Sequence, residues 1–395
     1  MTIVIILFWV SVSILFFCYI GYGILLLFLN GLLIIFRFKN KTVTLKEKLP
    51  VTLIVSAYNE EQVLEQKIKN TLAIEYPPDL LTIIFVIDGS ADGSLEMIQK
   101  HPAIILLHQK ERRGKFAAIK RAMQLVQTPI VVFSDANTML NKECIGRIVA
   151  HYHDPKVGGV AGEKKILHNH HISAVGEAEG FYWQYESFMK RLDAGFYTVV
   201  GAAGELFSIR SGLFRESDDE LILDDFVIST QVCLQGYKIE YEPGAFATEM
   251  PSATLAGEEK RKVRIAAGAF QSIGYLKKCL NIFKYPLLSF QYISRRLMRW
   301  ILCPVMLVIL LVTNVILVSN QPVNGFYNWF LFAQALFFFL VLTGWVFVRT
   351  GKRAGVLTIP FYFVFMNYCM VKGFIRFLKR RQTVLWEKSL RQVTD

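Results

Sequence analysis

The sequence predicts an α/β domain with a mainly parallel, Rossmann-like sheet that lies between membrane segments at the two ends of the chain. Between residues 50 and 140, apolar runs of strand length alternate with helical segments, the pattern typical of βαβ units. Residues 2–36 contain no charged side chain, and about 20 apolar residues suffice to cross a bilayer. A hydrophobic content of 53% agrees with a chain that lies partly in lipid.

Residues 1–40 form the first expected membrane segment. The segment lacks the basic start of a cleavable signal peptide, and its apolar run is longer than is usual for one. It ends at Arg37, Lys39 and Lys41, and positive residues beside a span favour the cytoplasmic side. We therefore expect one long span that is tilted or extends into the interface, followed by a cytoplasmic domain over residues 45–275.

Residues 301–375 hold the expected C-terminal membrane segments. Residues 301–318 should leave the cytoplasm and residues 329–348 should return to it, because the loop between them has no Lys or Arg. Residues 355–371 are short, contain Pro360 and precede five basic residues. A full crossing would place those charges outside, so we favour a re-entrant or interfacial segment over a fourth span. This layout predicts a multi-pass protein of the inner (cell) membrane.

The formal net charge of +12 is typical of proteins that bind nucleic acid or a membrane surface. Much of the excess flanks the apolar segments, including a basic cytoplasmic tail at residues 376–395, and no nucleic-acid-binding motif accompanies it. We therefore expect membrane contact and no nucleic-acid partner. Residues 280–300 mix arginines with apolar side chains and predict an amphipathic helix on the membrane, which anchors the domain or frames a path between domain and bilayer.

Three aspartates mark the expected ligand site. Asp88 and Asp135 each end an apolar run, and Asp225 follows Asp224 after another. Ligands of open α/β sheets bind beyond the carboxyl ends of the strands, so these acids should share one crevice. Carboxylates in such a crevice favour a metal ion and a diphosphate. The Gly-x-Gly-x-x-Gly and Walker sequences are absent, which disfavours dinucleotide and P-loop chemistry.

Several short motifs occur in the order seen in family-2 glycosyltransferases, which the chain resembles over roughly residues 51–268. They are Val55-Ser-Ala-Tyr-Asn-Glu-Glu61, Asp88-Gly-Ser-Ala-Asp-Gly-Ser94, Gly114-Lys115, Asp135-Ala-Asn137, Gly201-Ala-Ala-Gly204, Arg210 and Asp224-Asp225. The membrane layout resembles that of exopolysaccharide, cellulose, chitin and hyaluronan synthases. The resemblance implies a GT-A fold, with a nucleotide-sugar-binding half at about 50–140 and an acceptor half at 158–270.

The resemblance also implies roles in binding the donor. Ala57 and Glu60 would lie beside the base and ribose, and Asp88 would also bind the nucleoside. Lys115 would meet the phosphates. Together with Arg261 and Arg264, it would offset the charge on the leaving diphosphate. The nucleotide is UDP by family habit, although no residue excludes guanosine.

Asp135 matches the first aspartate of the family's Asp-x-Asp metal motif, and Asn137 stands in the second place. An amide oxygen is a neutral and weaker ligand than a carboxylate. Mg²⁺ or Mn²⁺ should still bind, because hard cations use one or two carboxylates and complete their shell with substrate phosphates.

Asp225 matches the family's general base. The attacking hydroxyl must lose its proton, and a positioned carboxylate that accepts it contributes about 10²–10⁴-fold. Asp224 stands where the family has glutamate, and it either holds the acceptor or raises the pKa of Asp225 through like charge. The candidate acceptor-binding residues are Gly204, Glu205 and Trp183, with Tyr185 as a second aromatic residue for stacking.

Processive synthases carry Gln-x-x-Arg-Trp where this chain has Arg261-Lys-Val-Arg-Ile265. The tryptophan usually stacks on the acceptor sugar, so Ile265 weakens the case for a processive enzyme. We therefore predict an inverting hexosyltransferase that uses a nucleotide diphosphate-sugar and a lipid-linked or growing polysaccharide acceptor at the cytoplasmic face.

Two alternatives remain. One is a processive synthase that also secretes its polymer; three or four spans are few for a pore, so an oligomer or partner subunit would then be needed. The less favoured one is a transporter with a nucleotide-sensing domain, because few residues of the membrane segments are ionisable and no inverted repeat is evident.

Overall fold

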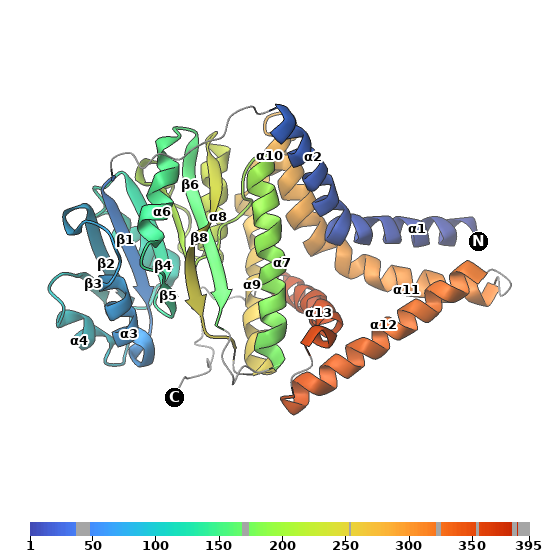
Figure 1. Cartoon of the computed structure of the whole chain (residues 1–395). Coiled ribbons are helices and arrows are strands. Elements are labelled where there is room, and N and C mark those ends of the chain that lie inside the picture. Colours follow the sequence, from blue (N-terminus) through green and yellow to red (C-terminus); the bar gives the residue numbers. More distant parts are fainter. Residues whose placement is uncertain are drawn as a thin grey trace.

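The computed structural model describes residues 1–36, 48–167, 174–252, 254–320, 325–352, 355–380 and 385. The basic residues predicted to follow the first span, at 37–41, and most of the predicted tail lie outside this described part. Figure 1 shows the sheet at one side of the molecule, upright helices beside it, and apolar helices that project away from the sheet.

In the described part of the chain, eight strands form one sheet in the order β3-β2-β1-β4-β7-β6-β8-β5. The first four pair in parallel, and β7 enters antiparallel between β4 and β6. The predicted α/β class with a mainly parallel, Rossmann-like sheet is therefore confirmed. The strands are β1 (Val51–Ala57), β2 (Leu81–Asp88), β3 (Ile105–Gln109), β4 (Ile130–Asp135), β5 (Thr138–Leu140), β6 (Val157–Ile166), β7 (Phe207–Arg210) and β8 (Lys238–Glu249).

Both faces of the parallel strands are covered by helices. All seven residues of β1 are buried, which is the pattern of a strand that packs on its two sides. Residues of α5 and α8 cover one face and residues of α3, α4 and α6 the other. These helices are α3 (Glu61–Leu72), α4 (Ser94–Gln99), α5 (Lys115–Met123), α6 (Cys144–Ala150) and α8 (Asp224–Leu234).

The strand register brings the predicted site residues to one edge of the sheet. Ala57 pairs with Ile87, and Ser56 pairs with Asp135. Because the strands are parallel, β1, β2 and β4 all end at this edge. Asp88 lies there too, because it is the last residue of β2 and comes directly after Ile87.

Two long helices, α7 (Ala174–Phe196) and α9 (Leu255–Tyr275), stand between the sheet and the apolar helices (Figure 1). The last long helix, α13 (Thr358–Leu378), packs along α9. A Cβ atom on Gly373 would lie 2.4 Å from the Cβ of Ala266. The two helix backbones therefore approach more closely than a larger residue would permit.

The N-terminal segment is one run long enough for the predicted span, and it bends within that run. It consists of α1 (Thr2–Phe16), a π-helical turn (Phe17–Gly21) and α2 (Tyr22–Phe36), and Figure 1 shows the change of direction between the two helices. The axis of α2 points in a different direction from that of α1 because α2 is hydrogen-bonded to α7. Tyr22 Oη donates to Asp193 Oδ1 at 2.6 Å, and Asn30 Nδ2 donates to the carbonyl oxygen of Leu192 at 3.0 Å.

The segment at 280–300 also differs from the prediction of a helix on the membrane surface. α10 (Pro286–Tyr292), a π-helix (Ile293–Leu302) and α11 (Cys303–Asn320) follow one another without a break. Arg295 and Arg296 are buried and face the soluble domain rather than lipid head groups. The reason is that buried acids on α7 neutralise them.

Within the described residues, four helical runs are long and apolar enough to cross a membrane: Thr2–Leu33, Pro286–Asn320, Gly325–Thr350 and Gly355–Leu378. The third is α12. The fourth was expected to be short, but Pro360 lies in the first turn of α13, where no helical hydrogen bond is lost, and the helix runs to Leu378. Its length therefore suffices for a crossing. These runs indicate a membrane protein.

Short 3₁₀ turns connect the longer elements. They are Pro78–Leu80, His151–His153, Ser211–Leu213, Lys277–Leu280 and Gly355–Leu357.

Candidate active site

Lys115 and three aspartates lie together beyond the strand ends. Lys115 Nζ is 2.6 Å from Asp135 Oδ1 and 3.7 Å from Asp224 Oδ2. A Cβ atom on Gly204 would lie 2.9 Å from Lys115 Nζ and 3.2 Å from Asp225 Oδ2. The glycine therefore keeps open the space between the lysine and Asp225. The structure thus brings together five residues that the sequence had assigned to donor, acceptor and catalysis.

Local structure explains how the aspartate pair reaches this place. Asp224 and Asp225 form the first turn of α8, where the helix dipole favours negative charge. Gly201 has a φ of +84°, and a Cβ atom there would lie 2.0 Å from the ring of Phe226. Only glycine permits the loop at 201–204 to pass this closely over α8.

The electrostatics of the site favour a proton acceptor at Asp225. Burial and the negative charge of Asp224 raise the pKa of Asp225 to about 7, while Lys115 acts in the opposite direction. Burial likewise raises the pKa of Asp135, with Lys115 opposing it. Burial alone would lower the pKa of Lys115, but the three surrounding aspartates hold it above its ordinary value. Lys115 is therefore a permanent cation beside a carboxylate that titrates near neutrality.

Asp88 binds the backbone of the residues that directly precede Lys115. It is 1% exposed and accepts hydrogen bonds from the backbone N–H groups of Arg113, at 3.1 Å, and Gly114, at 2.6 Å. Gly114 precedes α5, whose first residue is Lys115. Asp88 thus fixes the loop that presents Lys115, and its predicted contact with the nucleoside stays a prediction.

The other predicted nucleoside residues lie near this loop. Ala57 ends β1 and is fully buried, and Glu60 directly precedes α3. Their roles stay predictions. The sequence had not singled out the pair formed by Arg112 and Tyr58, in which the guanidinium lies 3.5 Å from the ring centre.

The structure fits a divalent metal at Asp135 only if the substrate supplies most of the ligands. The side chain of Asp135 is 30% exposed, and Asn137 Nδ2 donates to Glu249 Oε1 at 3.2 Å, which leaves the amide oxygen as its ligand atom. Among the described residues, no group of three or more His, Cys, Asp or Glu side chains is arranged to hold a metal. One carboxylate and one amide are a set that Mg²⁺ or Mn²⁺ completes with phosphate oxygens and water.

Arg261 is engaged by acids of the protein, and its predicted role toward a leaving diphosphate stays a prediction. Its guanidinium is surrounded by four acids, with nitrogen–oxygen distances of 2.8 Å to Glu179, 3.5 Å to Glu249, 3.7 Å to Glu258 and 3.8 Å to Glu205. The acids neutralise its charge, so Arg261 is part of a buried network.

Arg264 remains a candidate for the diphosphate. Its Nε is buried and has no hydrogen-bond partner within the part of the chain that the structure describes. Burial lowers its pKa to about 10, with nearby Arg376 and Arg112 adding to the effect and Asp224 opposing it. An incoming anion would relieve this cluster of positive charge.

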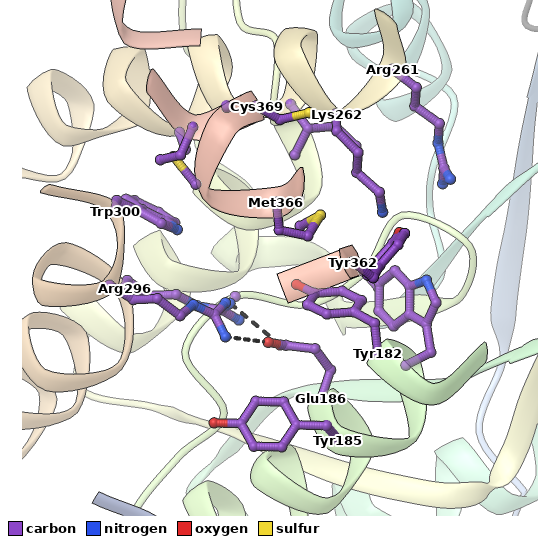
Figure 2. Close-up of a pocket in the computed structure, with 18 of the residues that line it drawn as sticks. Tyr182, Tyr185, Glu186, Arg261, Lys262, Arg296, Trp300, Tyr362, Met366 and Cys369 are labelled. Carbon is purple, nitrogen blue, oxygen red and sulfur yellow. Dashed lines mark hydrogen bonds and ion pairs between the residues drawn. The ribbon is translucent and has the colours of Figure 1, made fainter. Parts of the chain in front are cut away.

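A cavity of about 620 Å³ begins at Asp225 and reaches the apolar helices. Figure 2 shows aromatic and sulfur-containing side chains of α7, the π-helix and α13 around it. Asp225 lines this cavity, whereas Asp224 is buried and faces Lys115. Of the two alternatives for Asp224, this arrangement favours an effect on the pKa of its neighbour. Further lining residues are Tyr182, Trp183, Tyr185, Ile265, Trp300, Tyr362, Phe363, Met366 and Met370.

The predicted acceptor residues lie in or beside this cavity. Glu205 and Trp183 line it. Glu205 is ion-paired with the fully buried Lys164, whose Nζ also lies 4.6 Å from the ring centre of Trp183. Gly204 lies next to Asp225, and contact of these residues with an acceptor stays a prediction.

Sequence reasoning missed a buried charge cluster at the membrane side of the cavity. Glu186 lies 3.0 Å from Arg295 Nη2, 3.5 Å from Arg296 Nη1 and 2.5 Å from Arg299 Nη1, and Figure 2 shows its contact with Arg296. Burial alone would raise the pKa of Glu186, but the three arginines hold it well below its ordinary value. The signal was three arginines before an apolar run, which we had assigned to lipid head groups.

The fold and site define a GT-A glycosyltransferase architecture. A mannosyltransferase from Pyrobaculum calidifontis, solved in complex with GDP-Man and Mn²⁺, superimposes with a TM-score of 0.70. It is 19% identical in sequence, and the match covers 95% of this chain and 100% of that one.

The sequence comparisons identify the domain. The model of the family named Glycosyl transferase family 2 matches residues 52–217, and this chain therefore carries a family-2 glycosyltransferase domain. A poly-beta-1,6-N-acetyl-D-glucosamine synthase from Staphylococcus aureus is 28% identical over 59% of this chain and 58% of its own length. The synthase of the same name from Staphylococcus epidermidis is 24% identical over 56% and 55%. The matches thus span little more than half of these relatives.

Proposed function

We propose that this chain transfers a sugar, with inversion, from a nucleotide diphosphate-sugar to a lipid-linked or growing polysaccharide acceptor that approaches from the membrane. One observation carries the proposal. Asp225, a carboxylate with a pKa near 7, lies between the Lys115 cluster and a cavity lined partly by residues of apolar helices.

The donor would bind at the strand edge, with its diphosphate between Lys115 and Arg264. Both are cations beside the carboxylates of the site, and their charge would offset the charge that develops on the leaving diphosphate. A divalent cation held by Asp135 and Asn137 would add Lewis-acid stabilisation of the same oxygens. The Mn²⁺ bound to the structural neighbour supports a divalent ion.

Asp225 would act on the acceptor. One of its carboxylate oxygens, Oδ1, accepts the backbone N–H of Phe226 at 2.8 Å, and Oδ2 faces Gly204 and Lys115. Oδ2 would take the proton of an acceptor hydroxyl as that oxygen forms its bond to the anomeric carbon. The bond from this carbon to the diphosphate breaks, and its electron pair leaves with the diphosphate. A single displacement of this kind inverts the anomeric centre.

The acceptor would enter from the membrane side of the cavity. Tyr182, Trp183 and Tyr185 of α7 offer faces on which sugar rings can stack, and Met366 and Met370 of α13 offer an apolar surface. A sugar chain or a sugar carried on a lipid presents both kinds of surface. We place this reaction on the cytoplasmic face, where the positive residues after the first span would lie.

A processive polysaccharide synthase is the second candidate. The names of the staphylococcal relatives favour it, as does a cavity that continues from the base toward the apolar helices. Ile265 lines this cavity in the place of the tryptophan of processive enzymes. Its smaller surface would hold a growing chain less tightly, which favours addition of one or few sugars.

The test is transfer by the purified, detergent-solubilised protein, with a screen of nucleotide-sugars in Mn²⁺ or Mg²⁺ and sizing of the product. We expect turnover with one donor that stops in chelator and returns with metal. Unchanged turnover in chelator would contradict the metal assignment. A single added sugar would support the first candidate and a ladder the second. Failure to bind or turn over any donor would contradict both.

A further inference from the structure

Lys67 is a lysine without access to water. It lies on α3 between the buried residues Leu64, Ile68 and Thr71, and it is 0% exposed. Lysine is among the residue types that are least often fully buried. An ammonium group at such a position needs specific partners, because its desolvation is costly.

The partners of Lys67 flank the predicted metal motif. Its Nζ donates to Ser134 Oγ at 2.8 Å and to the carbonyl oxygen of Thr138 at 2.7 Å. Between these two residues lies the turn Asp135-Ala136-Asn137. The side chain of Lys67 therefore ties Ser134, near the end of β4, to Thr138, the first residue of β5.

The same turn is joined to the acceptor half through Ser134. Its hydroxyl donates to the carbonyl oxygen of Glu205 at 3.1 Å, and Thr138 Oγ1 donates to the carbonyl oxygen of Asp135 at 3.0 Å. Glu205 follows Gly204, the residue beside Lys115 and Asp225. Lys67 is thus linked through Ser134 both to the predicted metal motif and to the loop that carries Gly204 and Glu205.

Besides its hydrogen bonds, Lys67 has an electrostatic interaction with Asp135. Burial lowers the pKa of Lys67 to about 7, and the negative charge of Asp135 opposes this effect. A methionine would fill nearly the same space without desolvation of a charge. What the lysine adds is the pair of hydrogen bonds across the turn.

We propose that Lys67 is a positioning residue that holds the Asp135-Ala136-Asn137 turn in the geometry required to bind a divalent cation together with a nucleoside diphosphate. It acts from the protein interior, whereas Lys115 contacts Asp135 from the ligand side. The proposal rests on the proposed function, because the turn binds the donor only in a nucleotide-sugar enzyme.

The test compares the full-length wild type with Lys67→Met, Ser134→Ala and a control, Lys69→Met. Lys69 lies on the same helix, and its side chain is 72% exposed. Calorimetry measures the affinity for UDP and for GDP with Mn²⁺, and for uridine and guanosine without metal. Hydrogen exchange followed by mass spectrometry measures the opening of residues 134–138.

We expect Lys67→Met to weaken binding of the Mn²⁺–diphosphate about tenfold or more, the range found when groups that orient metal ligands are removed. Affinity for the nucleoside should stay within about twofold, and residues 134–138 should exchange faster. Lys69→Met should match the wild type. An equal loss of nucleoside and Mn²⁺–diphosphate binding would overturn the proposal, because it would indicate a general loss of structure.

Hydrogen exchange separates this proposal from the proposed function. If the wild type binds neither UDP nor GDP, the donor assignment fails, and exchange alone decides whether Lys67 holds the turn. Unchanged exchange at 134–138 in folded Lys67→Met would overturn the positioning role. If Lys67→Met does not fold, Ser134→Ala removes one of the two acceptors of the ammonium and decides the question by the same readouts.

Discussion

At the scale of single residues, Asp225 shows how position gives a common side chain a special task. Burial and the adjacent Asp224 raise its pKa to about 7, and Gly204 leaves its Oδ2 accessible. An ordinary aspartate, with a pKa near 3.9, would be too weak a base to take a proton efficiently at neutral pH. The two neighbours thus set both the basicity and the accessibility of the carboxylate.

Replacement of Asp225 tests its proposed role as the general base. We expect Asp225→Asn to lower kcat by about 10²–10⁴-fold, the usual contribution of a positioned general base, because the amide cannot accept the proton. Donor affinity, measured by calorimetry, should change little. Full transfer by a folded Asp225→Asn protein would contradict the assignment.

The pH dependence of transfer tests the role of Asp224. In the wild type, kcat/KM should fall as the pH drops through about 7, because Asp225 is then protonated. Asp224→Asn removes the like charge and lowers the pKa of Asp225. The acid limb of the pH profile should therefore move to lower pH. A limb that stays in place would show that Asp224 does not set the basicity of its neighbour.

At the scale of elements, α9 contacts the candidate active site with some residues and the apolar helix α13 with others. Arg264 and Ile265 face the site and its cavity, while Ala266 and Ala267 contact α13 at Gly373. The position of the arginine therefore depends on how closely the two helices pack.

Gly373→Ala tests this dependence. The new Cβ atom would lie 2.4 Å from Ala266 and 2.8 Å from the backbone nitrogen of Ala267, so the helices must separate. We expect a loss of about 1–3 kcal/mol of stability, measured by thermal unfolding in detergent, and reduced transfer. Gly274→Ala on α9 is the control, because nothing lies within 4 Å of its Cβ position. Equal behaviour of the two variants would contradict the close approach.

At the scale of the whole molecule, the cavity belongs to no single domain. Asp225 comes from the soluble part, Trp300 from the run that begins at Pro286, and Met366 from α13. The buried pairs between Glu186 and the arginines join α7 to the run that begins at Pro286, and α13 packs along α9. The α/β domain and the apolar helices therefore enclose the cavity together.

A bulky residue inside the cavity should separate acceptor entry from donor binding. Met366→Trp is expected to reduce transfer at least tenfold, an order-of-magnitude estimate for a blocked path, and to leave nucleotide affinity unchanged. Val371→Trp, at a position of α13 that is 43% exposed, is the control. Transfer rates and calorimetry on the two proteins in detergent provide the measurement. Normal transfer by Met366→Trp would contradict entry through this cavity.

The sequence determined the parts of the fold that depend on local patterns. Alternation of apolar runs and helical segments gave the parallel strands, and the end of a strand is visible in the chain as a change from apolar to acidic residues. For this reason Asp88 and Asp135 were predicted to share one edge of the sheet, and the strands that carry them end there. Uncharged stretches likewise showed where the apolar helices lie.

Only the tertiary structure decided which charged side chains are paired with other residues of the protein and which stay available to a ligand. Arg261 and Arg264 are three positions apart and look equivalent in the sequence, yet Glu258 of the same helix and three acids from distant segments surround the first. The sequence analysis did not single out Lys67, which is fully buried, and it assigned the arginines before residue 300 to contacts with lipid. The physical reason is that the energy of a charge depends on its partners and its burial, and both are set by contacts between segments far apart in the chain.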